Sequence, residues 1–323
     1  MTFIVAFLAL AVLIFFTGQY ARWNLARTFP APGKMIAVAQ HKLHVNCQGQ
    51  GSVVVILEAG LNDFSIHWHR LQPLLSQHTI TCSYDRAGLG WSEPSENQST
   101  LRNKVNDLRD VVQAVGSGQP LILVGHSFGS MITRLYAQQY PENVRALILV
   151  DPANEHMAER IPGYQEAIES AATQFKGLQP IASLGLMALA KNSIPADVLE
   201  GEALAQYRAV LASGSFFRGA FGESNAMLDN LEAMQQIKSE LSPTIPVVII
   251  SRAKTSSKID NLQKEILDQD GVWEELQQDL VRRLNATHIH SAQSEHRIQV
   301  SEPDLLYRKI LPFIEDFPHQ NEH

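Results

Sequence analysis

The sequence of 323 residues predicts an α/β fold, in which a doubly wound and mostly parallel sheet carries a helical insertion. Three observations support this class. Short runs of aliphatic and β-branched residues alternate with segments of helical periodicity, as in chains whose parallel strands are joined by crossover helices. One of these runs, residues 121–124, passes through a glycine-flanked turn directly into a helical pattern. A single long interval, residues 152–242, breaks the alternation and shows no strand pattern.

The N-terminal stretch predicts a membrane anchor. Residues 3–16 are uninterrupted apolar sequence and, with their neighbours, reach the length of about 20 residues that spans a bilayer. Aromatic Tyr20 and Trp23 follow at interfacial depth, together with Arg22 and Arg27. A cleaved signal peptide is the alternative. It requires a basic segment before the apolar run and a small-residue cleavage site after it, and neither is evident.

We therefore expect an uncleaved anchor over residues 1–20 and a linker over residues 21–34. The basic residues lie after the span, so the positive-inside rule predicts that the rest of the chain lies on the cytoplasmic face. Export through a signal peptide is the alternative localisation.

The strands of the sheet are recognised as short apolar runs. Continuous runs of this kind are typical of strands that are covered on both faces. Strands are predicted over residues 35–38, 42–47, 53–57, 79–84, 121–124, 146–150, 246–250 and 287–290. Helices are predicted over residues 66–75, 101–115, 131–140, 273–284 and 305–317.

The interval 152–242 predicts a cap. It contains helical material, notably over residues 203–211 and 227–238, and it lies between two strands of the sheet. Ligands of open α/β sheets bind at the carboxyl ends of the strands, so an apolar insertion there is expected to form a lid over a pocket. Candidate pocket-lining side chains are Trp91, Met157, Phe216, Phe217 and Phe221.

A candidate nucleophile stands between the strand at 121–124 and the helix that follows it. Gly125-His126-Ser127-Phe128-Gly129 is a Gly-x-Ser-x-Gly pattern in a strand–turn–helix context, which favours a nucleophile elbow over an ordinary turn. Glycines on both sides let strand and helix pass closely, and the tight turn exposes the hydroxyl of Ser127. Its position at a helix N-terminus provides N–H groups for developing negative charge.

Two further segments complete a resemblance to a known family. Glu58-Ala59-Gly60-Leu61 and Asp85-Arg86-Ala87-Gly88-Leu89-Gly90-Trp91-Ser92 precede the Gly-x-Ser-x-Gly segment, and the three together resemble the α/β-hydrolase superfamily, in particular its lid-bearing serine hydrolases and esterases. The resemblance covers about residues 35–317. It implies an eight-stranded sheet with a core over residues 35–151 and 243–323, a cap over 152–242, and a Ser, acid, His order along the chain.

The resemblance also implies an oxyanion hole made of two backbone N–H groups. One belongs to Phe128, which follows the nucleophile. Alignment with the family's His-Gly segment assigns the other to Leu61, although Ala59 stands where the family usually has histidine.

The base and the acid are expected near the ends of later strands. Chain order assigns the base to His296, in the segment that follows the last strand. Asp151 directly follows the sixth strand and is the preferred acid. In many family members the acid follows the seventh strand, where this chain offers no carboxylate before Asp260. Asp260 therefore remains an alternative, and so does Glu295, which adjoins His296.

Composition narrows the function. The formal net charge of -7 leaves no basic stripe for a nucleic-acid partner. No metal, dinucleotide or P-loop motif is evident, so we expect no cofactor and no metal. Cys47 and Cys82 lie in or beside predicted strands. They are expected to be free buried thiols in a cytoplasmic domain, whereas a disulfide would indicate export.

These residues predict a membrane-anchored serine hydrolase that cleaves a small-molecule ester or related acyl compound through Ser127, His296 and Asp151. An epoxide hydrolase or haloalkane dehalogenase of the same fold needs a carboxylate nucleophile, so Ser127 argues against both. A carbon–carbon bond hydrolase or a peptidase remains an alternative. A non-catalytic protein that binds a lipid-like ligand under the lid is the alternative of another class.

Overall fold

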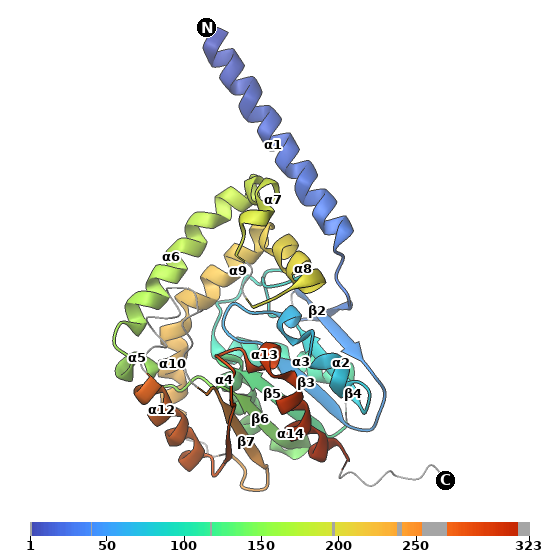
Figure 1. The fold of residues 1–323 in the computed structure, drawn as a ribbon, viewed down its shortest axis with the longest axis vertical. Helices are drawn as coiled ribbons and strands as arrows, with labels where there is room; N and C mark the ends of the chain where they lie inside the picture. Colours follow the sequence, from blue (N-terminus) through green and yellow to red (C-terminus); the bar gives the residue numbers. More distant parts are fainter. Residues whose placement is uncertain are drawn as a thin grey trace.

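A single mixed sheet forms the centre of the protein (Figure 1). The computed structural model describes residues 2–39, 41–116, 118–195, 198–237, 241–253 and 270–315. The eight strands follow the order β1-β2-β4-β3-β5-β6-β7-β8, in which β1 and β2 are antiparallel and the strands from β4 to β8 are parallel. Their bounds are β1 Lys34–Val38, β2 His41–Gln48, β3 Val54–Glu58, β4 Ile80–Tyr84, β5 Leu121–His126, β6 Val144–Val150, β7 Val247–Ser251 and β8 Thr287–His290. The predicted doubly wound, mostly parallel sheet is confirmed.

Helices cover both faces of this sheet because side chains alternate between the faces along each strand. Val54 and Ile56 of β3 belong to a hydrophobic cluster that includes α3, α4 and α12. Val55 and Leu57 point the other way, into a cluster that includes α2 and α14. The helices of the two layers are α2 Gln72–Leu75, α3 Leu101–Gly116, α4 Gly129–Gln139, α12 Asp270–Arg283, α13 Ile298–Ser301 and α14 Pro303–Glu315.

The helix predicted over residues 66–75 is not continuous. The chain forms a 3-10 turn, η1, over Ser65–Trp68 and then the short α2 over Gln72–Leu75. Pro73 lies in the first turn of α2. Proline has no N–H to donate to the preceding turn, and its ring clashes with the carbonyl of that turn, so it begins a helix there instead of continuing one.

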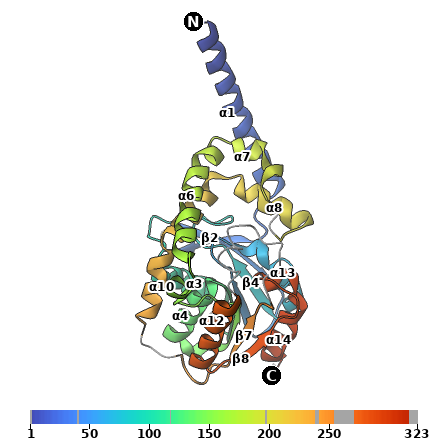
Figure 2. The ribbon, with the colours of Figure 1, turned by 60° about the vertical axis from the view of Figure 1, so that its left-hand side comes forward.

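All the regular elements that the structure describes between β6 and β7 are helical, and they are joined by turns and loops. Its elements are α5 Met157–Arg160, α6 Tyr164–Ser183, α7 Leu186–Leu189, η3 Lys191–Ser193, α8 Gly201–Leu211, α9 Gly214–Asn225 and α10 Met227–Gln235. The helices α6 to α9 stand over one end of the sheet (Figures 1 and 2). We refer to α5–α10 as the cap; the exact limits of a cap domain at residues 152 and 242 remain a prediction.

The N-terminal helix α1, Thr2–Thr28, projects far beyond the rest of the molecule (Figures 1 and 2). Among the described residues it is the helix long and apolar enough to cross a membrane. It continues past residue 20 into the predicted linker because its second half packs against the cap. There Gly18 lies against the backbone of Gly185, and the side chains of Gln19 and Arg22 donate hydrogen bonds of 3.0 and 2.8 Å to the carbonyl oxygen of Ser183.

The two cysteines form a disulfide between β2 and β4. Cys47 and Cys82 lie directly opposite each other in the register of this antiparallel pair, and their Cα atoms are 4.0 Å apart. The expectation of free buried thiols is therefore wrong for this structure. No local pattern predicts this disulfide, because the neighbouring position of β2 and β4 is a property of the strand order, in which β3 does not separate them.

Candidate active site

Ser127 lies in the tight turn between β5 and α4, with a left-handed φ of 48°. A Cβ on Gly125 would come within 2.5 Å of the Oγ1 of Thr133, and one on Gly129 within 2.4 Å of the carbonyl oxygen of Ala59. Side chains do not fit at such distances, so both flanking positions require glycine. The strained turn predicted from the sequence is present, and strain of this kind clusters at functional sites.

A buried carboxylate and an imidazole meet beyond the ends of β6 and β8. The Nδ1 atom of His296 lies 2.6 Å from Oδ2 of Asp151. Asp151 directly follows β6, is fully buried, and also accepts a hydrogen bond of 3.1 Å from the backbone N–H of Arg252. Burial opposes its ionisation, but the hydrogen bond from His296 and the charge of Arg252 outweigh burial and hold the pKa of Asp151 below its ordinary value. The carboxylate therefore favours the tautomer of His296 that carries its proton on Nδ1.

Trp273, at the start of α12, supports the same carboxylate. Its indole N–H donates a hydrogen bond of 3.0 Å to Oδ1 of Asp151, and its ring stands edge-on to that of His296 with centroids 5.8 Å apart. The sequence predicts a helix here but does not indicate this contact. Positions 151 and 273 come together only through the packing of α12 on the sheet, which no local pattern indicates.

A cavity of about 290 Å³ brings the candidate residues together. Ser127 and His296 both line it, as do Leu61 and Phe128. The remaining lining is mostly apolar and comes largely from the cap, including Ile168, Phe175, Tyr207, Leu211, Phe216 and Phe217. The structure describes no hydrogen bond between the hydroxyl of Ser127 and the ring of His296; in ligand-free enzymes such bonds are often long and tighten when substrate binds.

Three of the five side chains that the sequence suggested for the pocket line this cavity, namely Met157, Phe216 and Phe217. Trp91 lies elsewhere and packs against the ring of Phe64, with centroids 5.8 Å apart. Phe221 lines a separate cavity between α3 and α9.

The loop after β3 carries Leu61, a candidate oxyanion donor, and the buried side chain of Arg86 holds this loop in place. Arg86 donates hydrogen bonds of 2.7 and 2.6 Å to the carbonyl oxygens of Ala59 and Gly60. Because the C=O and N–H of a trans peptide point in opposite directions, the N–H of Leu61 points away from Arg86. The N–H of Phe128, the other candidate donor, stands at the first turn of α4.

Glu223, on the cap helix α9, joins this loop to the cap. Its carboxylate accepts hydrogen bonds of 2.5 Å from Nε of Arg86, 2.6 Å from Nζ of Lys104 and 3.0 Å from the backbone N–H of Asn62. Burial disfavours its charge, but Arg86 and Lys104 outweigh burial and lower the pKa of Glu223 to about 2. Arg86 and Glu223 thus tie the loop after β3 to the cap, and no sequence pattern indicated Glu223.

The loop that carries His296 is held at two further points. Arg297 forms an ion pair with Asp63, with 2.9 Å between Nη2 and Oδ1. His126, in the elbow, donates a hydrogen bond of 3.0 Å from Nε2 to the carbonyl oxygen of His296. Burial and the neighbouring His296 lower the pKa of His126 to about 3, so this imidazole is neutral. No pattern in the sequence indicated these contacts.

The alternatives for the acid stand as follows. Asp260 lies outside the described residues. Glu295 precedes His296, but the carboxylate that the structure describes in contact with the ring of His296 is that of Asp151. The geometry therefore brings together Ser127, His296 and Asp151 in the order Ser, acid, His along the chain.

Two curated proteins are similar in sequence to part of this chain. The chain is 31% identical over 106 residues to the uncharacterized protein YqjL of Bacillus subtilis, covering 33% of this chain and 42% of that protein. It is 28% identical over 125 residues to the cis-3-alkyl-4-alkyloxetan-2-one decarboxylase of Shewanella oneidensis, covering 38% of this chain and 39% of that enzyme. The match thus spans about two fifths of the length of each relative.

Solved structures share the fold over nearly the whole chain. The Cif epoxide hydrolase of Acinetobacter nosocomialis superposes with a TM-score of 0.70 at 16% identity, over 92% of this chain and 95% of that one. A thermophilic esterase from Thermogutta terrifontis superposes with a TM-score of 0.63 at 16% identity, over 87% of this chain and 98% of that one. At such low identity these matches establish the fold alone.

A family model described as the alpha/beta hydrolase fold matches residues 53–303. The matched stretch reaches from just before β3 to the first residue of α14 and contains Ser127, Asp151 and His296. The chain therefore belongs to the α/β-hydrolase family.

Proposed function

We propose that the protein is a serine hydrolase that cleaves an ester or a related acyl compound. The observation that carries the proposal is the 2.6 Å contact between His296 and the ionised Asp151, beside a cavity that Ser127 also lines. A serine hydroxyl is a weak nucleophile until a base takes its proton, and an imidazole oriented by a buried carboxylate is the usual base.

The reaction follows from these positions. The hydroxyl oxygen of Ser127 attacks the substrate carbonyl and gives its proton to Nε2 of His296. The N–H groups of Leu61 and Phe128 stabilise the oxyanion that forms, each contributing about 3 kcal/mol to the lowering of the barrier. His296 then protonates the leaving group, and a water molecule, activated by the same imidazole, releases the acyl group from Ser127. Asp151 stays ionised throughout and stabilises the imidazolium.

Ser127 distinguishes ester cleavage from the epoxide chemistry of one structural relative. An epoxide hydrolase of this fold needs a carboxylate nucleophile, whose alkyl ester is then hydrolysed at the carboxyl carbon. A serine at the elbow forms an acyl ester instead, which suits a substrate that brings its own carbonyl. The cavity of about 290 Å³ and its mostly apolar lining favour a small or slender acyl substrate.

We also propose that α1 is retained as a membrane anchor. Its second half is part of the folded protein: Leu25 is buried against Ala188 and Ala212 of the cap, and Gly18 lies against Gly185. A signal peptide is not expected to pack into the mature fold in this way. Near this contact the cap exposes apolar side chains, including those of Leu184 and Leu189. An anchored α1 would hold them at the bilayer surface, where an acyl substrate with a lipid tail is concentrated.

Two features of the chain predict opposite sides of the membrane for the folded domain. The basic residues after the span predict the cytoplasmic face. The disulfide between Cys47 and Cys82 supports the opposite face, because disulfides persist in oxidising compartments and are rare in the cytosol. We propose the non-cytoplasmic face, since a charge bias of a few residues is easily overridden.

Labelling with a fluorophosphonate tests the chemistry. The full-length protein, held in detergent, should be modified at Ser127, and Ser127→Ala should abolish the modification. Hydrolysis of p-nitrophenyl esters of graded acyl length should depend on the same residue. A protein that resists the reagent and hydrolyses none of these esters while correctly folded is a binder and not a serine hydrolase.

A further inference from the structure

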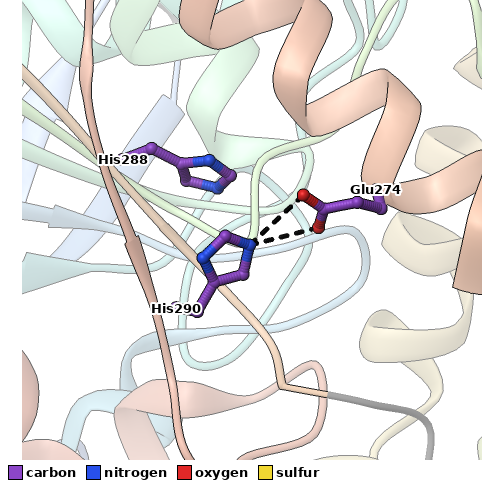
Figure 3. Close-up of side chains that lie close together, drawn as sticks. All are labelled: Glu274, His288 and His290. Carbon is purple, nitrogen blue, oxygen red and sulfur yellow. Dashed lines mark hydrogen bonds and ion pairs between the residues drawn. The ribbon is translucent and has the colours of Figure 1, made fainter.

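A second cluster of chemically capable side chains lies outside the cavity, between α12 and the edge strand β8 (Figure 3). His288 and His290 are two residues apart on β8 and therefore project from the same face of the strand. Glu274 of α12 faces them. Its carboxylate oxygens lie 3.2 and 3.3 Å from Nε2 of His290, and the rings of the two histidines have centroids 4.2 Å apart.

The donor set suits a divalent transition metal. One ligand atom from each of the three residues lies within 4.8 Å of the other two. Zinc–nitrogen and zinc–oxygen bonds of about 2.0–2.2 Å in a tetrahedral site require ligand atoms about 3.3 Å apart. The contact between His290 and Glu274 already has this spacing. The remaining contraction is within the range of side-chain rotation, since all three residues are at least partly exposed.

A chain of buried hydrogen bonds fixes His288 in the tautomer that a metal needs. The side-chain amide of Gln277 donates to the carbonyl oxygen of Pro152, so its Oε1 faces Ser251 as an acceptor. The hydroxyl of Ser251 donates to that oxygen and must therefore accept from Nε2 of His288, at 2.8 Å. Nδ1 of His288 is then unprotonated and free to bind a cation. Metal-ligating histidines characteristically use their second nitrogen in such an outer hydrogen bond.

We propose that Glu274, His288 and His290 bind a divalent transition-metal ion of the zinc class, which links α12 to β8. The sequence shows no metal motif because the ligands come from two elements that meet only in the fold. The link has a structural consequence. The residue before Glu274 is Trp273, which donates to Asp151, and β8 leads into the loop that carries His296. A bound ion would fasten together the two segments that deliver the partners of Asp151.

Metal titration tests the site without reference to catalysis. Full-length protein without a polyhistidine tag is stripped with a chelator and titrated calorimetrically with Zn²⁺, and with Co²⁺ for its visible absorption spectrum. We expect binding of one ion with micromolar or tighter affinity, a cobalt spectrum typical of four or five nitrogen and oxygen ligands, and a higher unfolding temperature in the presence of Zn²⁺.

Substitutions test whether Glu274, His288 and His290 are the residues that bind the ion. His290→Ala and Glu274→Gln should weaken binding at least tenfold, and Ser251→Ala should weaken it about tenfold by releasing the tautomer of His288. The matched control is His156→Ala, which removes the histidine of another exposed His–Glu pair, 3.1 Å from Glu159 on α5. Binding that is lost equally in the control, that survives His288→Ala/His290→Ala, or that is weaker than about 100 µM in the unaltered protein overturns the proposal.

Discussion

The indole N–H of Trp273 lies 3.0 Å from Oδ1 of Asp151, the carboxylate whose other oxygen accepts from His296. Each oxygen of this buried acid thus has its own donor, and one of these donors is anchored on a helix outside the sheet. Removing a buried charge from water is costly unless hydrogen bonds satisfy it. The position of α12 is therefore tied to the ionisation of Asp151.

Substitution of the acid tests its assignment. We expect Asp151→Asn to lower kcat for a p-nitrophenyl ester by about 10⁴-fold with little change in KM, because asparagine favours the wrong tautomer of His296. Asp260→Asn is the matched control, since Asp260 is the alternative acid, and it should keep near-normal kcat. The reverse pattern, with the large loss in Asp260→Asn, would reassign the acid.

Because His126 is neutral in the folded protein, the free energy of unfolding should depend on pH. Its pKa is about 3 in the folded protein, whereas the unfolded chain binds the proton below about 6.5. The unfolded state therefore holds more protons between these values, and stability falls as the pH is lowered, by about 1.4 kcal/mol per pH unit. Carboxylates such as Glu223, with a pKa lowered from 4.5, contribute only at lower pH.

Urea unfolding at pH 6.5 and pH 5 measures this effect. The unaltered protein should lose about 2 kcal/mol more over this interval than His126→Gln, whose amide can still donate to the carbonyl oxygen of His296. The other histidines are present in both proteins, so the comparison isolates the contribution of position 126. Equal losses in the two proteins would show that His126 is protonated in the folded state.

The buried carboxylate of Glu223 should be essential for stability. Glu223→Ala leaves Arg86 and Lys104 buried without their shared partner, and we expect it to lower the free energy of unfolding by about 3–5 kcal/mol. Glu202→Ala on α8 removes an exposed carboxylate from the same cap and should change stability by less than about 0.5 kcal/mol. Similar small effects at both positions would mean that water solvates this network.

Most of the fold and part of the site could be predicted from local sequence. A continuous apolar run indicates the strand at Val54–Glu58, and two glycines at fixed spacing indicate the elbow around Ser127. The contacts that hold the site could not be predicted in this way. Glu223 and Arg86 are 137 residues apart and meet only because α9 packs over the loop after β3. The residues that adjoin Glu223 and Arg86 in the sequence give no indication of this ion pair.

The disulfide between Cys47 and Cys82 could not be predicted from local sequence either, and its presence can be tested directly. Thiol titration of the denatured, unreduced protein should detect no free thiol, and reduction should release both Cys47 and Cys82. The double variant Cys47→Ser/Cys82→Ser should be less stable by about 3–4 kcal/mol, as the pair closes a loop across 35 residues. The reduced unaltered protein is the control and should be equally destabilised. Free thiols in protein isolated from its native membrane would favour the cytoplasmic face.

The contact between α1 and the cap is tested by two glycine substitutions. A Cβ at Gly18 would meet the carbonyl oxygen of Leu184 at 2.8 Å and the backbone of Gly185 at 3.0 Å, so Gly18→Ala must push α1 away from the cap. Gly177→Ala, in α6, meets nothing within 4 Å and is the matched control, because alanine there improves helix propensity by up to about 1 kcal/mol.

In detergent, Gly18→Ala should increase proteolysis within residues 21–34 and lower the unfolding temperature, whereas Gly177→Ala should leave cleavage unchanged and raise that temperature slightly. In vesicles both variants should remain membrane-bound, since the apolar run of residues 3–16 is intact. If the packed second half of α1 holds the cap at the bilayer, only Gly18→Ala should lose activity selectively toward vesicle-borne long-chain esters. Equal behaviour of the two variants would mean that α1 tethers the enzyme without orienting its cap.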